Sequence, residues 1–463
     1  MKELPQTWVL STLGQLAGTG QYGWTTKAIA EGNIKFLRTT DITKGAIDWE
    51  NVPFCYEAPS NKDQYNLRSG DILISRAGSV GFSVLLENIP FPAVFASYLI
   101  RYLPEKTIVI PRYLASFLKS QSYWKQIAGA SSGIALANIN ASKLSELIVP
   151  LAPLNEQKRI ADKLDKILAR VDACRERFDH IPIILKRFRQ AVLAAATSGK
   201  LTEEWRQDRN NEPWAKTGIS VYGDEILESV ASSWIWKPFA EVAEITSNLV
   251  DPKILPESIH LAPNHIESGS GRILEVSNVQ KDKVKSSKHK FYNGQIVYSK
   301  IRPYLNKVVL VNFDGVCSAD MYPINATINA RYLLIWMLSV RFVEWASQKQ
   351  GRVVLPKINQ NALNKIPVPV PPIEEQTEIV RRVEELFAYA DRIETRYQTA
   401  RAQVDKLTPA VLAKAFRGEL VPQDPNDEPA SVLLERIERD SVHNKVKSEH
   451  TRKKRLETNI KSC

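Results

Sequence analysis

Short loops rich in hydrogen-bond donors recur in both halves of the chain, and their side chains are of the kinds that read DNA. They comprise residues 38–42, 75–79, 97–98 and 131–133 in the first half, and residues 277–279, 299–302, 318–320, 352 and 357 in the second. Arginine bonds to guanine edges and asparagine to adenine edges, whereas serine, threonine and lysine suit phosphate oxygens. Each loop alone is weak evidence, because an exposed arginine is usually only solvated. Their repetition at matching places predicts a DNA-binding surface in each half.

The sequence patterns of several enzyme classes are missing. There is no Gly-x-x-x-x-Gly-Lys-Ser/Thr for nucleotide phosphates, no His-Glu-x-x-His, and no Asp/Asn-Pro-Pro-aromatic motif of amino-methyltransferases. The histidines at 180, 260, 265, 289, 443 and 450 never lie at the spacing of metal ligands, so no metal site is expected. We therefore expect a chain without catalytic residues of its own.

Two partial motifs are set aside. Residues 18–23 match Gly-x-Gly-x-x-Gly, but the residues after them do not open an amphipathic helix, which favours a mobile glycine loop over a dinucleotide site. Glu156-Gln157-Lys158 resembles half of a nuclease carboxylate-lysine motif but lacks the partner aspartate.

Composition narrows the class of protein. The 463 residues predict roughly two to four domains, and 44% apolar with 24% charged residues is typical of globular chains. No apolar run reaches the roughly 18 residues of a membrane span, and no signal-peptide segment opens the sequence. Four scattered cysteines suggest a reducing cytoplasm. The net charge of +11 favours a polyanionic partner, nucleic acid first, although part of the excess could serve solubility.

An internal repeat organises the whole chain. Residues 150–157 recur as residues 369–376, and the same offset continues without a gap to residues 199–201 and 418–420. Upstream of this segment the halves share little, except short matches such as Asn138-Ile139-Asn140 with Lys357-Ile358-Asn359. Each half therefore consists of a diverged globular domain followed by a repeated segment.

The repeated segment has a coiled-coil period. Apolar residues fall at 160, 164, 167, 171, 174, 178, 181, 185, 188 and 192, and again at 379, 383, 386, 390, 393, 397, 400, 404, 407 and 411. Alternating steps of four and three keep one apolar stripe facing a partner helix. The seam residues singled out are Ile160, Leu164, Ile167, Val171, Phe178, Leu185, Ile379, Val383, Leu386, Ile393, Tyr397 and Val404.

Prolines and glycines set the limits of the two helices. Prolines at 150, 153, 369, 371 and 372 cannot extend a helix backward, and Gly199 and Gly418 are natural stops. Pro182 should kink the first helix. The two helices most simply pair with each other, antiparallel, which would place the globular domains at opposite ends of a rigid spacer, related by a pseudo-two-fold. The alternative is that each helix joins a separate partner chain.

We therefore expect an α/β fold: two α/β domains separated by two long antiparallel coiled-coil helices. The expected segments are an N-terminal domain (1–152), a first spacer helix (153–201), a linker (202–232), a second domain (233–371), a second spacer helix (372–421) and a basic, mobile tail (422–463). Strands are expected at 71–75 and 295–299, and helices at 113–118 and 332–338.

Two diverged domains, each followed by a Pro-Leu/Ile-x-Glu-Gln helix, resemble the specificity subunit of type I restriction-modification systems. The most specific segments are residues 152–158, 185–193, 199–202, 379–384 and 412–420, which look most like the IA branch of that family. The resemblance covers nearly the whole chain. It implies that the globular parts are target recognition domains, each reading half of an asymmetric bipartite site in double-stranded DNA.

The resemblance also implies the partners. Two methyltransferase subunits would dock on the spacer helices and supply S-adenosylmethionine chemistry, and two ATP- and Mg-dependent translocase-nuclease subunits would complete the complex, with no membrane involved. The DNA-binding residues implied are Arg38, Thr40, Asp41, Arg76, Ser79, Tyr98, Asn278, Lys300, Arg302, Asp320, Arg352 and Lys357.

Two other hypotheses remain from the sequence. The chain could itself be a methyltransferase or nuclease, which the missing motifs argue against. It could also be a free-standing coiled-coil adaptor or repressor that binds DNA without partner subunits.

Overall fold

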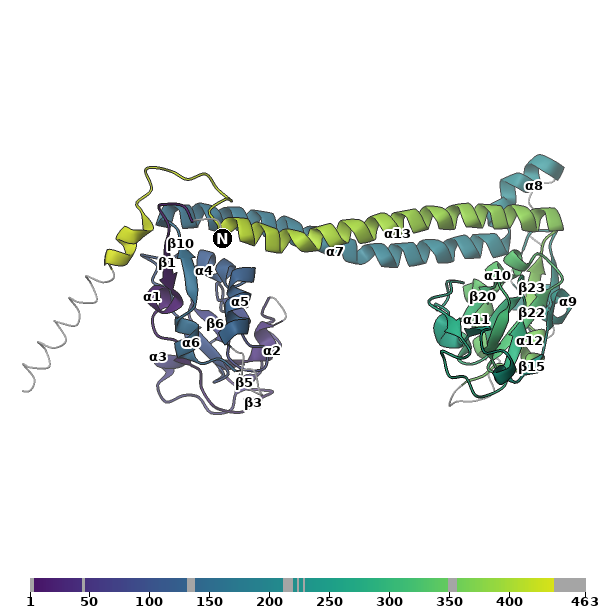
Figure 1. Cartoon of the computed structure of the whole chain (residues 1–463), viewed down its shortest axis with the longest axis horizontal. Helices are drawn as coiled ribbons and strands as arrows, with labels where there is room; N and C mark the ends of the chain where they lie inside the picture. Colours follow the sequence, from purple (N-terminus) through teal and green to yellow (C-terminus); the bar gives the residue numbers. More distant parts are fainter. Residues whose placement is uncertain are drawn as a thin grey trace, which may run out of the picture. The chain divides into compact units, whose positions relative to one another are not determined.

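The computed structural model describes residues 4–43, 46–130, 138–210, 220–222, 225–227, 230–348 and 356–436 (Figure 1). The chain forms two compact units, one of residues 1–177 with 400–463 and the other of residues 178–399. Each unit thus holds one globular domain and a part of each long helix. No helix in the described ranges is both long and apolar enough to cross a membrane.

The described part of the globular domain in the first unit contains two four-stranded sheets and the two-stranded pair of β1 and β10. Its strands are β1 (Val9–Thr12), β2 (Gln21–Tyr22), β3 (Ala28–Ile29), β4 (Lys35–Leu37), β5 (Phe54–Cys55), β6 (Ile72–Ser75), β7 (Ser83–Leu85), β8 (Ala93–Phe95), β9 (Leu99–Tyr102) and β10 (Ile148–Leu151). Its helices are α1 (Leu13–Ala17), α2 (Thr39–Ile42), α3 (Lys62–Tyr65), α4 (Pro111–Phe117), α5 (Gln121–Ala130) and α6 (Ala141–Ser145). One sheet has the order β2-β9-β6-β7 and the other β3-β5-β4-β8, with β4 and β8 parallel.

The second unit contains the corresponding domain. Its strands are β13 (Ile235–Pro238), β14 (Ala243–Ile245), β15 (Leu249–Val250), β16 (Ile259–Leu261), β17 (Ser277–Asn278), β18 (Lys288–Phe291), β19 (Ile296–Ser299), β20 (Val308–Leu310), β21 (Gly315–Ser318), β22 (Met321–Ala326) and β23 (Pro367–Val370). Its helices are α9 (Phe239–Val242), α10 (Ala330–Leu338), α11 (Val340–Gln348) and α12 (Gln360–Asn364), with 3₁₀ turns η2 (Pro252–Ile254), η3 (Pro263–His265) and η4 (Pro303–Leu305).

The two domains repeat one topology although their sequences diverge. The sheet β14-β22-β19-β20 has the order and antiparallel pairing of β2-β9-β6-β7, and the parallel pair β16–β21 matches β4–β8. The described sheet of the second domain differs by adding β18 beside β21 and β15 beside β18, and it has no strand in the place of β3.

The central strand of each domain is buried on both faces. In β6, Ile72 and Ile74 join one apolar core while Leu73 joins another, because successive side chains of a strand point to opposite faces. In β19, Ile296 and Val297 divide between two cores in the same way. This explains why both strands are unbroken apolar runs in the sequence.

The long helices are α7 (Leu154–Ser198) and α13 (Ile373–Ala415), and they pack antiparallel within each unit (Figure 1). In the first unit, Lys163 Nζ donates to the Leu420 carbonyl at 2.8 Å, and Arg175 Nε to Asp405 Oδ1 at 3.3 Å. In the second, Arg189 Nη2 donates to Asp391 Oδ1 at 2.7 Å. The expected pairing of the two repeated helices with each other is therefore confirmed.

The predicted seam residues are all buried or half-buried in the structure. Ile160, Leu164 and Ile379 have no exposed surface. Two positions of the period behave differently, since Cys174 and Leu407 are exposed. Not every apolar position of the coiled-coil period is therefore buried between the two helices.

Pro182 was expected to kink the first helix. It lies inside α7 and does not end it, because the helix continues to Ser198. Gly199 ends α7 with a φ of 84°, a conformation that glycine adopts without strain. Both long helices thus begin directly after the prolines, α7 ends at the residue before Gly199, and α13 ends at Ala415, three residues before Gly418.

One sequence expectation needs correction. Residues 18–23 are not a mobile loop: β2 lies there and pairs with β9, and a Cβ on Gly23 would lie 2.3 Å from the Phe95 carbonyl oxygen. The expected linker contains α8 (Glu203–Asn210), the 3₁₀ turn η1 (Lys200–Thr202) at its border, and the paired strands β11 (Ser220–Tyr222) and β12 (Glu225–Leu227). Residues 430–436 are helical, and the basic tail from residue 437 lies outside the described residues.

Candidate nucleic-acid interface

The repeated Glu-Gln pair fixes each globular domain to its long helix. In the first unit, Trp8 Nε1 donates to Glu156 Oε2 at 3.0 Å, and burial raises the pKa of this carboxyl group. Gln157 is fully buried: it accepts from the Ile110 N–H at 2.8 Å, and its Nε2 donates to the Ile108 carbonyl at 2.9 Å. These contacts hold the domain on the first turn of α7.

The second unit repeats this arrangement. Trp234 Nε1 donates to Glu375 Oε2 at 3.0 Å, and Gln376 Oε1 accepts from the Asn329 N–H at 2.9 Å. Arg206 of α8 also bonds to Glu375, so the segment after α7 closes onto the start of α13. The motif therefore has a structural role, in agreement with its dismissal as a nuclease motif.

A group of polar side chains lies where β6 ends, and we call Arg76, Tyr98 and Asn138 the first polar ledge. Arg76 N–H donates to the Tyr98 carbonyl at 2.9 Å, and the Arg76 carbonyl accepts from the Ile139 N–H at 3.0 Å. The guanidinium lies over the Tyr22 ring at 4.8 Å, and Nε is 3.4 Å from Asn138 Oδ1. Tyr98 is 61% exposed. The ledge thus presents an arginine fork, an amide and an aromatic ring.

The second domain has a matching group at the end of β19, and we call Lys300, Asp320 and Lys357 the second polar ledge. Lys300 N–H donates to the Asp320 carbonyl at 3.0 Å, and the Lys300 carbonyl accepts from the Ile358 N–H at 3.0 Å, as in the first domain. Lys357 Nζ is 3.0 Å from Asp320 Oδ1, with both side chains about two-fifths exposed. Such a surface pair contributes little to stability, so its groups are free to exchange partners.

Arg302 lies beside this ledge with an unusual backbone. It is exposed, its φ is 49°, and its N–H donates to the Pro356 carbonyl at 2.8 Å. A non-glycine residue in the left-handed region is uncommon and is often held there for function.

The remaining predicted residues that the structure describes show no hydrogen bond or ion pair to the ledges. Arg38 and Asp41 bond mainly to each other, at 2.9 Å, around the first turn of α2, where Thr40 is exposed. Ser79 is half-buried in the turn between β6 and β7. Asn278 donates to Glu257 Oε2 at 3.2 Å. Arg352 lies outside the described residues.

The structure corrects one correspondence between the halves. Residues 38–42 and 277–279 hold similar places along the two halves of the sequence, but β4 and β16 are the equivalent strands of the two parallel pairs. The helix after β4, α2, therefore corresponds to η3 and not to residues 277–279. Asn138 was missed as a site residue, although its match with Lys357 in the repeat was a signal for it.

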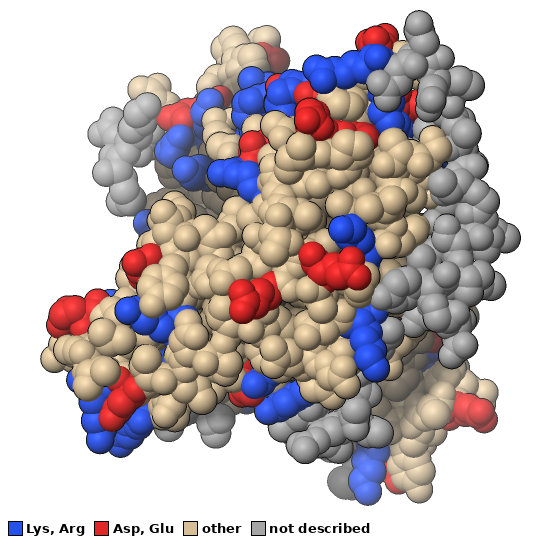
Figure 2. Space-filling view, turned by 90° about the vertical axis from the view of Figure 1, so that its right-hand side faces the viewer, with Lys and Arg blue, Asp and Glu red and all other residues tan. Residues whose placement is uncertain are grey.

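Charge is mixed over the face of the second unit that Figure 2 shows. Lysine and arginine alternate with aspartate and glutamate, and uncharged areas separate them. Among the described residues on this face, acidic and uncharged side chains interrupt the basic ones.

One group of side chains has the composition of a metal site. His260, His265 and Asp282 each place a ligand atom within 4.8 Å of the others. Linear spacing along the sequence did not reveal this group, because the fold brings Asp282 next to the two histidines.

Comparison with known proteins identifies the family that shares this architecture. The family model described as type I restriction modification DNA specificity domain matches residues 5–178 and 237–400. The EcoDI specificity subunit of Escherichia coli is 42% identical over 425 residues, covering 89% of this chain and 94% of that protein. The EcoKI specificity subunit of E. coli K12 is 31% identical, covering 94% and 96%.

Solved structures share the fold. The HsdS subunit from Thermoanaerobacter tengcongensis matches with a TM-score of 0.56 at 17% identity, covering 90% of this chain and 98% of that one. A chain from a structural study of complex assembly and conformational transition of the type I R-M system matches with a TM-score of 0.62 at 16% identity, covering 91% and 100%.

Proposed function

Because this chain belongs to the family of type I restriction-modification specificity subunits, we propose that it reads an asymmetric, bipartite target in double-stranded DNA, with one half-site for each globular domain. As a specificity subunit it determines DNA target recognition within the restriction-modification complex and is itself non-catalytic. The proposal adds the form of the target and the residues that read it.

The observation that carries the proposal is the pair of unlike ledges on one topology. The first polar ledge offers Arg76 and Asn138, and the second offers Lys300 and Lys357, at equivalent ends of β6 and β19. An arginine fork suits a guanine edge, whereas lysine acts as a point charge. Different side chains at equivalent places would read different bases, so the two half-sites would differ.

The residues proposed to contact DNA fall into the two domains. They are Arg38, Thr40, Asp41, Arg76, Ser79 and Tyr98 in residues 1–152, and Asn278, Lys300, Arg302, Asp320, Arg352 and Lys357 in residues 233–371. Asn138 is added to the first set because of its contact with Arg76.

The proposed partners act through the paired helices. Two methyltransferase subunits would dock there and hold S-adenosylmethionine, and two translocase-nuclease subunits would use ATP and Mg. The seam residues named above would keep the helices paired as a spacer of fixed length.

Methylation mapping tests the proposal. Cells that carry the chain with its methyltransferase partner are expected to show methylated adenine in one two-part motif, and Arg76→Ala to relax one part of it. Arg76→Lys is the matched variant: it keeps the charge but loses the fork, so relaxation by both variants indicates base reading and rescue by lysine indicates a phosphate contact. A single contiguous motif would contradict the bipartite reading. Sequence-specific binding by the lone chain, without methylation in the presence of the partner, would favour an adaptor or repressor.

A further inference from the structure

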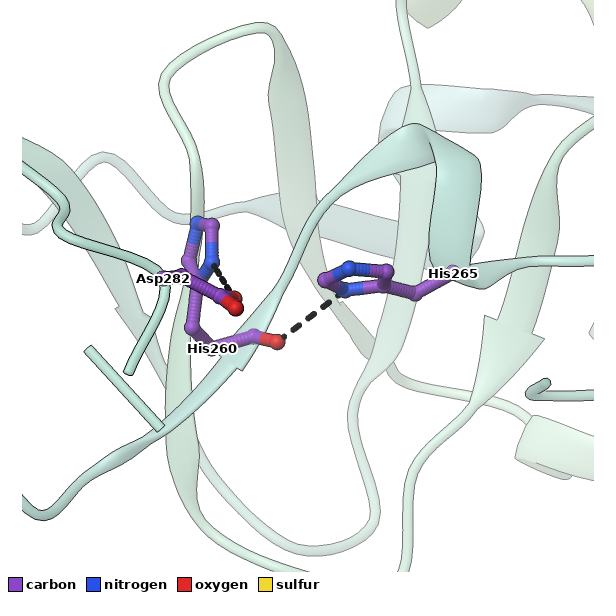
Figure 3. A group of neighbouring side chains, drawn as sticks. All are labelled: His260, His265 and Asp282. Atoms are coloured by element: carbon purple, nitrogen blue, oxygen red, sulfur yellow. Dashed lines mark hydrogen bonds and ion pairs between the residues drawn. The ribbon is translucent and has the colours of Figure 1, made fainter. Parts of the chain in front are cut away.

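Three side chains of metal-binding type meet on the second domain (Figure 3). His260 lies on β16, His265 ends η3, and Asp282 lies in the turn between β17 and β18. Three separate segments of the chain thus contribute to one group.

The distances fit a small ion. His260 Nδ1 is 2.8 Å from Asp282 Oδ2, and the nitrogen-bearing end of the His265 ring points toward both residues (Figure 3). A tetrahedral zinc ion with bonds of about 2.0–2.2 Å holds its ligand atoms roughly 3.3 Å apart. Two of the three atoms are already that close, and His265, which is only half-buried, is the ring that would turn inward.

Neighbouring groups orient the candidate ligands. The Ser277 hydroxyl donates to Asp282 Oδ1, which leaves Oδ2 facing His260. His265 Nδ1 accepts from the Ala262 N–H at 3.2 Å and lies 3.2 Å from the His260 carbonyl oxygen. In the other tautomer Nδ1–H donates to that carbonyl and gives up the bond from Ala262, and Nε2 is then free to bind a metal, which is the usual support of a ligating histidine.

A purely structural histidine is expected to have both ring nitrogens satisfied when it is buried. His260 is 8% exposed, and its Nε2 has no hydrogen-bond partner among the described residues. Nε2 is not the ring nitrogen that faces Asp282, so a metal bound at Nδ1 would leave Nε2 unpaired, and the site rests on the three ligand atoms that lie together.

We propose that His260, His265 and Asp282 bind one Zn²⁺ ion, with the fourth position open to water. Two imidazoles with one carboxylate favour zinc over magnesium or calcium, which prefer oxygen ligands. The ion joins β16 to the turn of residues 279–284, whose backbone is closed by Asp282 N–H to Asn278 carbonyl at 3.1 Å. The ion would thereby stabilise the segment that carries Asn278. Zinc binding itself is independent of the proposed function, and only an effect of zinc on DNA recognition would rest on the proposed contact between Asn278 and DNA.

Zinc titration of the full-length, chelator-treated chain with ZnCl₂ tests the site. Wild type is expected to bind one more Zn²⁺ per chain than His265→Gln or Asp282→Asn, or to bind it at least tenfold more tightly. Replacing ZnCl₂ with CoCl₂ should give visible absorption bands that both variants lack. His180→Ala is the control, because His180 is exposed on α7 and far along the chain from the cluster, and it should bind as wild type does.

Thermal unfolding gives a second readout that does not depend on DNA. Saturating ZnCl₂ should raise the Tm of wild type by at least about 2 °C and leave that of His265→Gln unchanged. The proposal would be overturned if wild type and both variants bound zinc equally, or if zinc left the Tm of wild type unchanged. The group would then be a simple His260–Asp282 pair. Either result leaves the methylation test above unaffected.

Discussion

At the scale of single residues, buried glutamine side chains decide how the domains attach to the helices. Gln157 uses both ends of its amide, accepting from the Ile110 N–H and donating to the carbonyls of Ile108 and Ala152. Gln376 repeats the role by accepting from Asn329.

Gln157→Ala should lower the free energy of unfolding by at least about 2 kcal/mol, because buried backbone groups lose their partners. Chemical denaturation of the purified chain measures this. Asn155→Ala is the matched control, since Asn155 is exposed two residues earlier, and it should change stability by less than about 0.5 kcal/mol. Similar losses in both variants would show that the amide contacts are unimportant.

At the scale of elements, the seam between α7 and α13 depends on burial and not on the apolar period alone. Leu164 has no exposed surface and lies in the core of the first unit, whereas Leu407 belongs to the same period but is 44% exposed. The two leucines therefore separate periodicity from packing.

Leu164→Ala should destabilise the chain by about 2–5 kcal/mol through lost burial and the cavity left behind. Leu407→Ala should cost less than about 1 kcal/mol, because most of its side chain stays in water. Denaturant midpoints of the two variants provide the comparison. Equal midpoints would mean that the packing described for α7 and α13 is wrong.

The first turns of α13 also carry a pH-sensitive ion group. Hydrogen bonds from Arg381, and then from Arg382, lower the pKa of the Glu378 carboxyl from 4.5 to about 2. A carboxyl group whose pKa is lower in the folded state contributes stability above its unfolded pKa and loses it as the pH falls.

Glu378→Gln should therefore lose about 0.5–1 kcal/mol relative to wild type near pH 7, a modest value because the arginines are partly in water. The difference between the two proteins should shrink as the pH falls from about 4.5 toward about 2. Stability measured across this range checks the sign; a difference that grows on acidification would contradict it.

At the scale of the whole molecule, two units of one topology carry different polar ledges. Arg76 and Lys300 occupy equivalent positions but belong to separate compact units. Residues without shared partners usually contribute independently. The free energy of binding to the target should therefore be the sum of two separate contributions, one from each domain.

The variants Arg76→Ala and Lys300→Ala, assembled with the methyltransferase partner, should each weaken binding to the methylated motif by about 1–3 kcal/mol for a base contact. The double variant should show the sum of the two losses within about 0.5 kcal/mol. Binding measured on duplexes with one half-site scrambled assigns each residue to a half-site. Strong non-additivity, or relaxation of the same half-site by both variants, would refute independent reading.

The sequence by itself determined the repeat and where both long helices begin, and it favoured their pairing with each other over pairing with separate chains. These follow from local rules: prolines exclude helix before residues 154 and 373, Gly199 permits a left-handed stop, and a period of 3.5 residues requires a partner helix. The family resemblance rested on the same repeated segment.

Only the tertiary structure decided which polar residues meet. Asn138 joins Arg76, α2 corresponds to η3, and Asp282 reaches His260, because strand pairing brings together residues that are far apart in sequence. Exposure of Leu407 was equally hidden, since an apolar period shows which face of a helix is apolar but not how far the partner covers it.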